Sequence, residues 1–248
     1  MISVLYEDAD VIVVEKPAGL ESQSSRGFEP DMVSQIRAHI HKLSPNGSTK
    51  STKQPPYVGV IHRLDKPVRG VMVYAKNRKA AAALSAQIQS GKMQKTYAAV
   101  VCGKPVDNHG AYVDYLLKNQ GNNQSEIVDN SVDGAQRAEL IYTVLGTKNA
   151  GNLMPETPDF ELALLDIELL TGRYHQIRSQ LSHHGTPIYG DNRYGICDPC
   201  GKPAPRRPLA LCARKLTFRH PSTGAPMTFE ITPSGGAFQL FGQVEFPA

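Results

Sequence analysis

Short runs of apolar and β-branched residues, divided by turn-forming residues, constrain the fold of this chain more than any other feature. In the run from Glu161 to Leu170, the positions Ala163, Leu165, Ile167 and Leu169 alternate with a second set, Leu162, Leu164, Asp166 and Glu168. This period of two fits a half-buried strand. Further strands are expected at Ile2 to Leu5, Val11 to Val14, Val58 to Ile61, Val71 to Ala75, Thr96 to Val101 and Ala138 to Leu145, and a hairpin is expected over Leu216 to Ile231. The pattern favours an α/β (α+β) chain with many antiparallel strands.

Three segments have the spacing and the end signals of helices. The first follows Asp31 and has apolar residues at three- and four-residue intervals. The second runs from Arg78 to Ser90 after the capping residue Asn77, and the third runs from Tyr174 to His184 before Gly185. Ser44 to Pro56 predicts a mobile loop, and Gly103 to Gly134 predicts short strands with long turns. No repeat or strong linker is visible, so we expect one domain over residues 1–248.

One acid, Asp65, stands alone in a basic segment. Between Lys53 and Lys95 the chain has nine Lys and Arg residues and no other Asp or Glu. Nearby cations favour the ionised form of a carboxylate, and they attract a polyanion such as RNA. The segment therefore favours a nucleophile or base that acts on nucleic acid. The alternative is a structural acid that ties its loop to Arg63 or Arg69.

Charge and cysteine content limit the class of protein. The net charge is only +4, but the cations gather in two segments, which favours a cationic RNA-binding face as much as two solvated faces. The first residues lack a basic leader, and no apolar run is long enough to cross a bilayer. Four cysteines do not resemble a secreted disulfide framework in a chain of this length. We expect a cytoplasmic protein without membrane contact.

Several motifs in order resemble the RluA-type RNA pseudouridine synthases. The central motif is His62-Arg63-Leu64-Asp65, followed by Gly70 and a strand. The others span nearly the whole chain: Leu5-Tyr6-Glu7-Asp8 through Lys16-Pro17-Ala18-Gly19-Leu20, Lys95-Thr96-Tyr97, Thr171-Gly172-Arg173-Tyr174-His175-Gln176-Ile177-Arg178, Gly185 to Asp191, and His220-Pro221 with Met227-Thr228-Phe229. The resemblance implies a single pseudouridine-synthase-type domain whose mixed, mainly antiparallel central sheet is flanked by helices. It also implies conversion of a specific uridine in ribosomal or transfer RNA to pseudouridine, without a cofactor.

The resemblance assigns three catalytic residues. Asp65 is the nucleophile or base, and sequence does not decide whether it acts at the ribose or on the pyrimidine ring. Arg178 is the cation paired with Asp65, with a phosphate-binding or surface arginine as the alternative. Tyr97 packs on the target base and helps to remove its C5 proton, with a core tyrosine as the alternative.

The resemblance also implies substrate-binding residues. Arg63 enters the space that the extruded uridine leaves, with a phosphate contact as the alternative. The full substrate-binding set is Arg63, His62, Leu64, Arg69, Arg173 and Leu181. The chain departs from the family pattern at Val68-Arg69, where Thr-Ser is usual, and at Cys212, where histidine is usual. No separate S4-type RNA-binding module is expected, so RNA choice would come from the catalytic domain, and protein partners stay unknown.

Three alternative interpretations concern a metal site and two other functions. Cys197 and Cys200, with Cys212 and His220, could bind zinc, but a second spaced pair is lacking and we expect no metal. A non-catalytic RNA-binding or assembly factor would keep the fold without turnover. A base-removing glycosidase would use the same carboxylate, although such hydrolysis usually needs a second acid, and neither basic segment supplies one near a motif.

Overall fold

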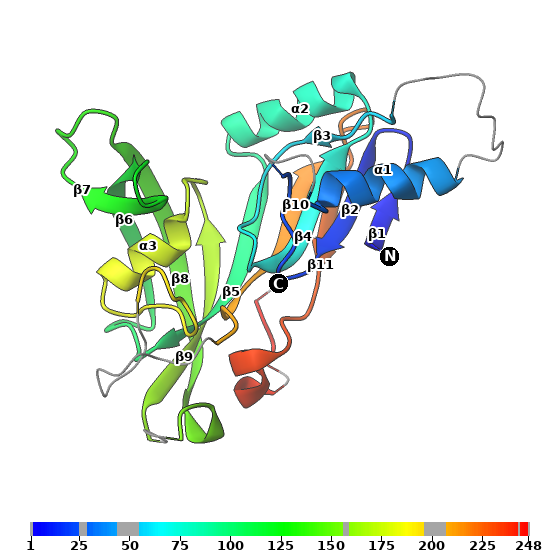
Figure 1. Ribbon diagram of the computed structural model, residues 1–248. Coiled ribbons are helices and arrows are strands. Elements are labelled where there is room, and N and C mark those ends of the chain that lie inside the picture. The colour runs from blue at the N-terminus through cyan, green and yellow to red at the C-terminus, as the bar shows by residue number, and fades with distance from the viewer. Residues whose placement is uncertain are drawn as a thin grey trace. The chain divides into compact units, whose positions relative to one another are not determined.

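A computed structural model describes residues 2–24, 29–43, 55–155, 159–195, 207–242 and 244–247. The chain divides into two compact units, each with its own strands and helices (Figure 1). The first unit comprises Met1–Gln94 and Ala213–Ile231, and the second comprises Lys95–Cys212 and Thr232–Ala248. The predicted α+β class is confirmed, because few helices accompany strands that pair mainly antiparallel.

The first unit is a sheet with helices packed on it. Strand β1 (Ser3–Glu7) pairs antiparallel with β2 (Val11–Lys16), and β2 pairs antiparallel with β4 (Arg69–Ala75). The short β3 (Gly59–Val60) pairs with β4, and β10 (Leu211–Arg219) pairs antiparallel with β11 (Pro226–Glu230). The strands predicted at Ile2 to Leu5 and Val11 to Val14 and the hairpin predicted over Leu216 to Ile231 are therefore confirmed. The strand predicted over Val58 to Ile61 is only two residues long.

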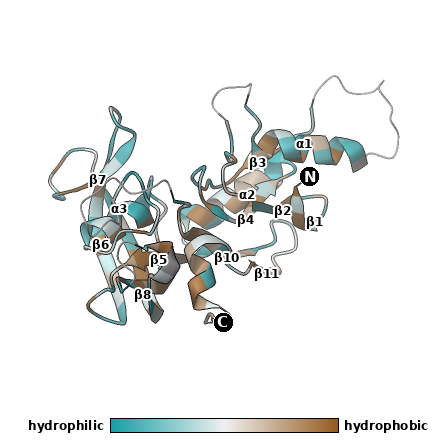
Figure 2. Cartoon of the chain, turned by 60° about the horizontal axis from the view of Figure 1, so that its bottom comes forward, coloured by the Kyte–Doolittle hydropathy of each residue, from teal (hydrophilic) through white to brown (hydrophobic). Residues whose placement is uncertain are grey.

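Helices α1 (Met32–Leu43) and α2 (Arg78–Gln89) begin at the predicted caps. The backbone N–H of Ser34 donates to Oδ1 of Asp31 at 2.7 Å, and that of Ala80 donates to Oδ1 of Asn77 at 2.9 Å. Polar and apolar residues alternate in patches along α1, as an amphipathic helix requires (Figure 2). The predicted loop from Ser44 to Pro56 lies almost wholly outside the described residues.

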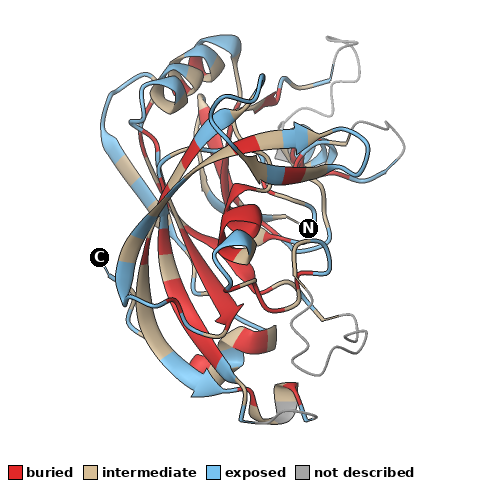
Figure 3. Cartoon of the chain, turned by 90° about the vertical axis from the view of Figure 1, so that its left-hand side faces the viewer, coloured by how far each residue is buried: buried red, intermediate tan, exposed pale blue. Residues whose placement is uncertain are grey.

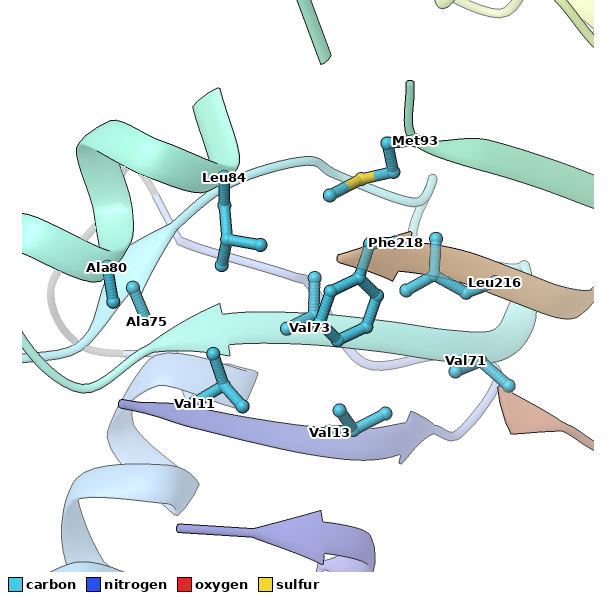
Figure 4. Close-up of a cluster of buried hydrophobic side chains, with 10 residues drawn as sticks. All are labelled: Val11, Val13, Val71, Val73, Ala75, Ala80, Leu84, Met93, Leu216 and Phe218. Atoms are coloured by element: carbon cyan, nitrogen blue, oxygen red, sulfur yellow. The ribbon is translucent and has the colours of Figure 1, made fainter. Parts of the chain in front are cut away.

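The core of the first unit lies under α2. Ala80 of α2 lies beside Ala75 of β4, and Leu84 points toward Val73 of the same strand (Figure 4). The same buried cluster includes Val11 and Val13 of β2. Both faces of β2 and β4 are buried, since Ile12, Val14, Met72 and Tyr74 are also fully inaccessible. Continuous apolar runs therefore replace simple alternation in these two strands. The loop that carries Asp65 emerges directly from this core.

The second unit contains a sheet in the order β5-β9-β8-β6-β7 with antiparallel neighbours. Its strands are β5 (Gln94–Cys102), β6 (His109–Asn119), β7 (Gln124–Val128), β8 (Gln136–Asn149) and β9 (Glu161–Leu169). The 3₁₀ turn η1 (Gly151–Leu153) lies between β8 and β9, and η2 (Gly236–Phe241) follows β11 in the sequence. The prediction of short strands with long turns after Gly103 is wrong for β6, which has 11 residues. In β9 the predicted inward face is confirmed, because Ala163, Leu165, Ile167 and Leu169 are all buried, but Leu162 and Leu164 of the opposite face are buried as well.

Helix α3 (Gln176–His183) is shorter than the predicted Tyr174 to His184. His175 has a left-handed backbone (φ 51°), which prevents helical hydrogen bonding before Gln176. Gly185 follows the helix with φ 79°, as its sequence position predicts. Residues 176–181 are all buried, so most of α3 lies in the interior of the unit (Figure 3). No described helix has the length and apolarity needed to span a bilayer.

Candidate functional site

Asp65 lies on the loop of residues 61–68 that joins β3 to β4. Its carbonyl accepts the N–H of Val68 at 3.0 Å, which closes a tight turn, and Asp65 itself is half-buried. The hydroxyl of Ser22 donates to the carbonyl of Leu64 at 2.9 Å and accepts the N–H of Leu64 at 2.9 Å. Because Ser22 and Leu64 are both buried, the backbone just before Asp65 is fixed from the interior.

Lys16 fixes the same loop from the other side of Asp65. This lysine is fully buried, and its ammonium donates to three carbonyls, those of Pro17 at 3.0 Å, Leu20 at 2.6 Å and Lys66 at 3.1 Å. Three acceptors satisfy all three ammonium protons. Burial lowers the pKa of Lys16 to about 8, while the negative charges of Asp65 and Glu21 act in the opposite direction. Lys16 therefore supplies both an anchor and a positive charge close to Asp65.

The other predicted residues of this unit differ in their surroundings. His62 accepts the N–H of Val73 through Nε2 at 3.2 Å, and Leu64 is buried. Arg69 lies in β4, not in the expected loop, and its Nε donates to Oε1 of Glu15 at 2.5 Å. Arg63 is exposed on the loop beside Asp65. The structure thus gathers His62, Arg63, Leu64 and Asp65 on one anchored loop, with Arg69 at the start of the next strand.

In the second unit, Arg178 projects from α3 into a buried ion pair with Asp191. Nε and Nη2 of Arg178 donate to the two carboxylate oxygens of Asp191, each at 2.8 Å. The side chains are 6% and 0% exposed, so this is a desolvated bidentate pair. The segment that carries Asp191 lies along β5, since Tyr189 N–H donates to the carbonyl of Val100 at 2.9 Å. The predicted pairing of Arg178 with Asp65 stays a prediction.

Tyr194 contacts both members of this ion pair. Its ring centroid lies 5.2 Å from the guanidinium carbon of Arg178, and its N–H donates to Oδ1 of Asp191 at 3.2 Å. Its hydroxyl accepts the N–H of Ser125 at 2.6 Å and bonds Nδ1 of His175 at 2.8 Å. Burial raises the pKa of Tyr194, so the phenol keeps its proton. The guanidinium of Arg178 is consequently held in one orientation.

The remaining predicted residues of the second unit lie on three elements. Tyr97 is buried in β5, opposite Ile167 of β9. Leu181 is fully buried in α3. Arg173 is exposed on the turn before α3, and its Nε donates to the carbonyl of Arg137 at 2.9 Å. The roles of these residues in catalysis and binding stay predictions.

Sequence reasoning missed four residues that fix the candidate site: Lys16, Ser22, Asp191 and Tyr194. Lys16 and Asp191 stood within motifs, yet no local pattern indicated that each would be buried against a residue far along the chain. The cysteine pair Cys197 and Cys200 lies outside the described residues. Within the described ranges, no group of three His, Cys, Asp or Glu side chains is placed to hold a metal ion.

Comparison with known proteins gives a consistent result. A family model described as RNA pseudouridylate synthase matches residues 10–183. An uncharacterized RNA pseudouridine synthase of Aquifex aeolicus is 33% identical over 93% of this chain and 69% of its own length. The tRNA pseudouridine synthase C of Pectobacterium carotovorum is 29% identical over 100% of this chain and 66% of its own length. The ribosomal large subunit pseudouridine synthase D of Pseudomonas aeruginosa is 30% identical over 92% of this chain and 67% of its own length.

Among solved structures, human RNA pseudouridylate synthase domain containing 4 superposes with a TM-score of 0.70 at 21% identity. The match covers 94% of this chain and 88% of that one, and it concerns the fold alone. The chain spans about two thirds of the length of the curated relatives above.

Proposed function

Because the chain belongs to the RNA pseudouridylate synthase family, we propose that it is an RNA pseudouridine synthase. Such enzymes are isomerases. The bond between C1′ of the ribose and N1 of uracil breaks, the base turns, C1′ bonds to C5, and the C5 proton leaves while N1 gains one. All atoms of the uridine are retained apart from exchanged protons, so the reaction balances without water, oxidant or reductant.

Asp65 is the group that carries the reaction in this proposal. The observation that supports it is the double anchoring of its loop, through the ammonium of Lys16 on one side and the hydroxyl of Ser22 on the other. Because the backbone on both sides of Asp65 is already fixed, the loop loses little conformational entropy when substrate binds. It can attack or deprotonate the ribose, or add to the pyrimidine ring.

Tyr97 and Arg178 complete the proposed catalytic set. The Arg178 guanidinium is already oriented by Asp191 and Tyr194, which favours a defined electrostatic role over a loose phosphate contact. The base of the target uridine would pack on Tyr97, and exposed Arg63 would fill the space that the extruded base leaves. His62, Leu64, Arg69, Arg173 and Leu181 are assigned to RNA binding.

The substrate is proposed to be ribosomal or transfer RNA in the cytoplasm. The names of two relatives support this range, one naming tRNA and the other the large ribosomal subunit. Both units are proposed to form one catalytic domain, because the family match over residues 10–183 includes residues of each unit. Substrate choice would then come from the surface of that domain.

Release of tritium tests the proposed reaction. Unmodified transfer and ribosomal RNA transcripts carrying tritium at uridine C5 are incubated with the protein, and the label in the solvent is counted. A synthase releases the label and leaves the RNA chain without abasic sites. Abasic sites would identify a glycosidase, and RNA binding without release or abasic sites would identify a binding factor. Either result would overturn the proposal.

A further inference from the structure

The side chain of Lys95 lies beside the turn of residues 171–173 in the second unit. Lys95 is the second residue of β5 and is partly buried. A Cβ atom at Gly172 would lie 3.1 Å from its Nζ, so the ammonium sits directly over the backbone of that glycine. Glycine at position 172 therefore leaves room for the ammonium.

Within the described residues, the ammonium of Lys95 has no hydrogen bond or ion pair. The nearby acid Glu139 is already engaged, because Oε2 of Glu139 accepts from Nη1 of Arg137 at 2.5 Å. Among the described residues, the charge that acts on the pKa of Lys95 is that of a second cation, Arg173. Burial and, to a lesser extent, the charge of Arg173 lower the pKa of Lys95. Two adjacent cations without a carboxylate partner favour the binding of an anion.

The turn that presents these cations is rigid. Oε1 of the buried Gln176 accepts both the hydroxyl of Thr171 at 2.8 Å and the N–H of Arg173 at 3.0 Å. Thr171 Oγ1 in turn accepts the N–H of Glu139 at 2.8 Å, which ties the turn to β8. Arg173 donates through Nε to the carbonyl of Arg137, and the residue is exposed. The site is built before any ligand arrives.

We propose that Lys95, Gly172 and Arg173 form a binding site for one phosphodiester group of the RNA, next to the nucleotide that contacts Tyr97. Lys95 and Tyr97 are two positions apart on β5, so they share one face of the strand about 7 Å apart. That spacing suits a base on Tyr97 and an adjoining phosphate on Lys95. The site rests on the proposed function and adds Lys95 as a phosphate-binding residue that positions the target nucleotide.

The test measures RNA affinity as a function of salt for Lys95→Gln, with unmodified transfer and ribosomal RNA transcripts as probes. Loss of one phosphate contact should weaken binding about tenfold and reduce the slope of log K against log salt by about 0.7 to 0.9. Lys95→Arg should keep the slope, because it keeps the charge. Gly172→Ala should weaken binding without any change of charge, because its methyl group crowds the ammonium.

Lys148→Gln is the matched control. Lys148 is exposed on β8, nine positions from Glu139 and so about 30 Å from the turn, and its loss should change neither the affinity nor the slope. An unchanged slope in Lys95→Gln would overturn the site, as would equal losses in the control.

Thermal unfolding separates binding from a structural role. Removal of a partly buried cation without a partner should raise the unfolding temperature of Lys95→Gln, whereas a lower unfolding temperature would mean that Lys95 stabilises the fold and would contradict the proposal. Tritium release by the wild-type protein is read in parallel. Without release, the isomerase assignment fails whatever the salt slopes are. With release and an unchanged slope, only the phosphate site fails.

Discussion

Two buried cations belong to the candidate site, Lys16 beside the loop of Asp65 and the predicted catalytic residue Arg178, and different groups bind each of them. Lys16 is surrounded by backbone carbonyls, whereas Arg178 faces a carboxylate in a bidentate pair. A carbonyl cage compensates the hydrogen bonds of an ammonium but only part of its charge, so the pKa of Lys16 falls. The geometry of a guanidinium matches a carboxylate, so the Arg178 pair is fixed in direction as well as in charge.

Loss of the Asp191 carboxylate should be costly. Asp191→Ala removes the bidentate partner of a buried guanidinium and is expected to lower the free energy of unfolding by about 3–5 kcal/mol. The matched control is Glu29→Ala, which breaks an ion pair with Lys66 whose side chains are 52% and 56% exposed and should cost less than about 1 kcal/mol. Urea denaturation of both variants measures the difference. Equal losses of unfolding free energy in the two variants would show that the buried ion pair stabilises the fold no more than the exposed one.

Lys16 should make stability depend on pH in an alkaline window. Its pKa is about 8 in the folded protein and 10.5 ordinarily, so between these values the unfolded chain binds more protons than the folded one. The contribution of this residue to the free energy of unfolding therefore rises with pH in this window, by up to about 1.4 kcal/mol per pH unit. Below pH 8 both states are protonated and the contribution is constant.

Lys16→Met removes this titration. Denaturant unfolding at several values between pH 8 and pH 10 should give a smaller upward slope, or a steeper decline, for the variant than for the wild-type protein. Parallel curves would mean that the buried ammonium does not titrate in this range.

Among the helices and strands, the residues that cap helix ends predict the structure well, whereas the patterns that set the length of an element predict it less well. Asp31, Asn77 and Gly185 mark helix ends in both sequence and structure, because each acts through local hydrogen bonds or backbone angles. The start of α3 was misplaced because the left-handed conformation of His175 depends on its contacts with Tyr174 and Tyr194. In β6 only Leu116 is buried, so the strand has no buried face that would require a regular apolar pattern. Its length of 11 residues therefore could not be predicted from such a pattern.

Gly70 shows how one element restricts a residue in the next. A Cβ at this position in β4 would lie 2.4 Å from Cβ and 2.6 Å from the carbonyl oxygen of Ala213 in β10. Gly70→Ala must therefore displace backbone, and we expect a loss of about 2–3 kcal/mol in unfolding free energy. Gly146→Ala in β8 meets nothing within 4 Å and should change stability by less than about 0.5 kcal/mol. Similar melting temperatures for the two variants would contradict this.

The order of the sequence motifs between Leu5 and Phe229 predicts both the family and the α+β class, and both predictions are confirmed. Lys16, Ser22 and Asp191 could not be assigned from sequence, because their partners lie 50, 42 and 13 residues away and no periodic pattern connects them. The division into two compact units was also not visible, since no linker composition marks residues 94–95 or 212–213.

The proposed reaction depends most on the carboxylate of Asp65, which Asp65→Asn removes. The amide keeps the size of the side chain and removes its charge, so C5 tritium release should fall by more than about a thousandfold, or about 4 kcal/mol of activation free energy, while RNA affinity stays within a few-fold. Asp107→Asn, which alters an exposed acid in the second unit, should release tritium at the wild-type rate. Undiminished release by Asp65→Asn would contradict the role of Asp65 as the carboxylate that carries the reaction.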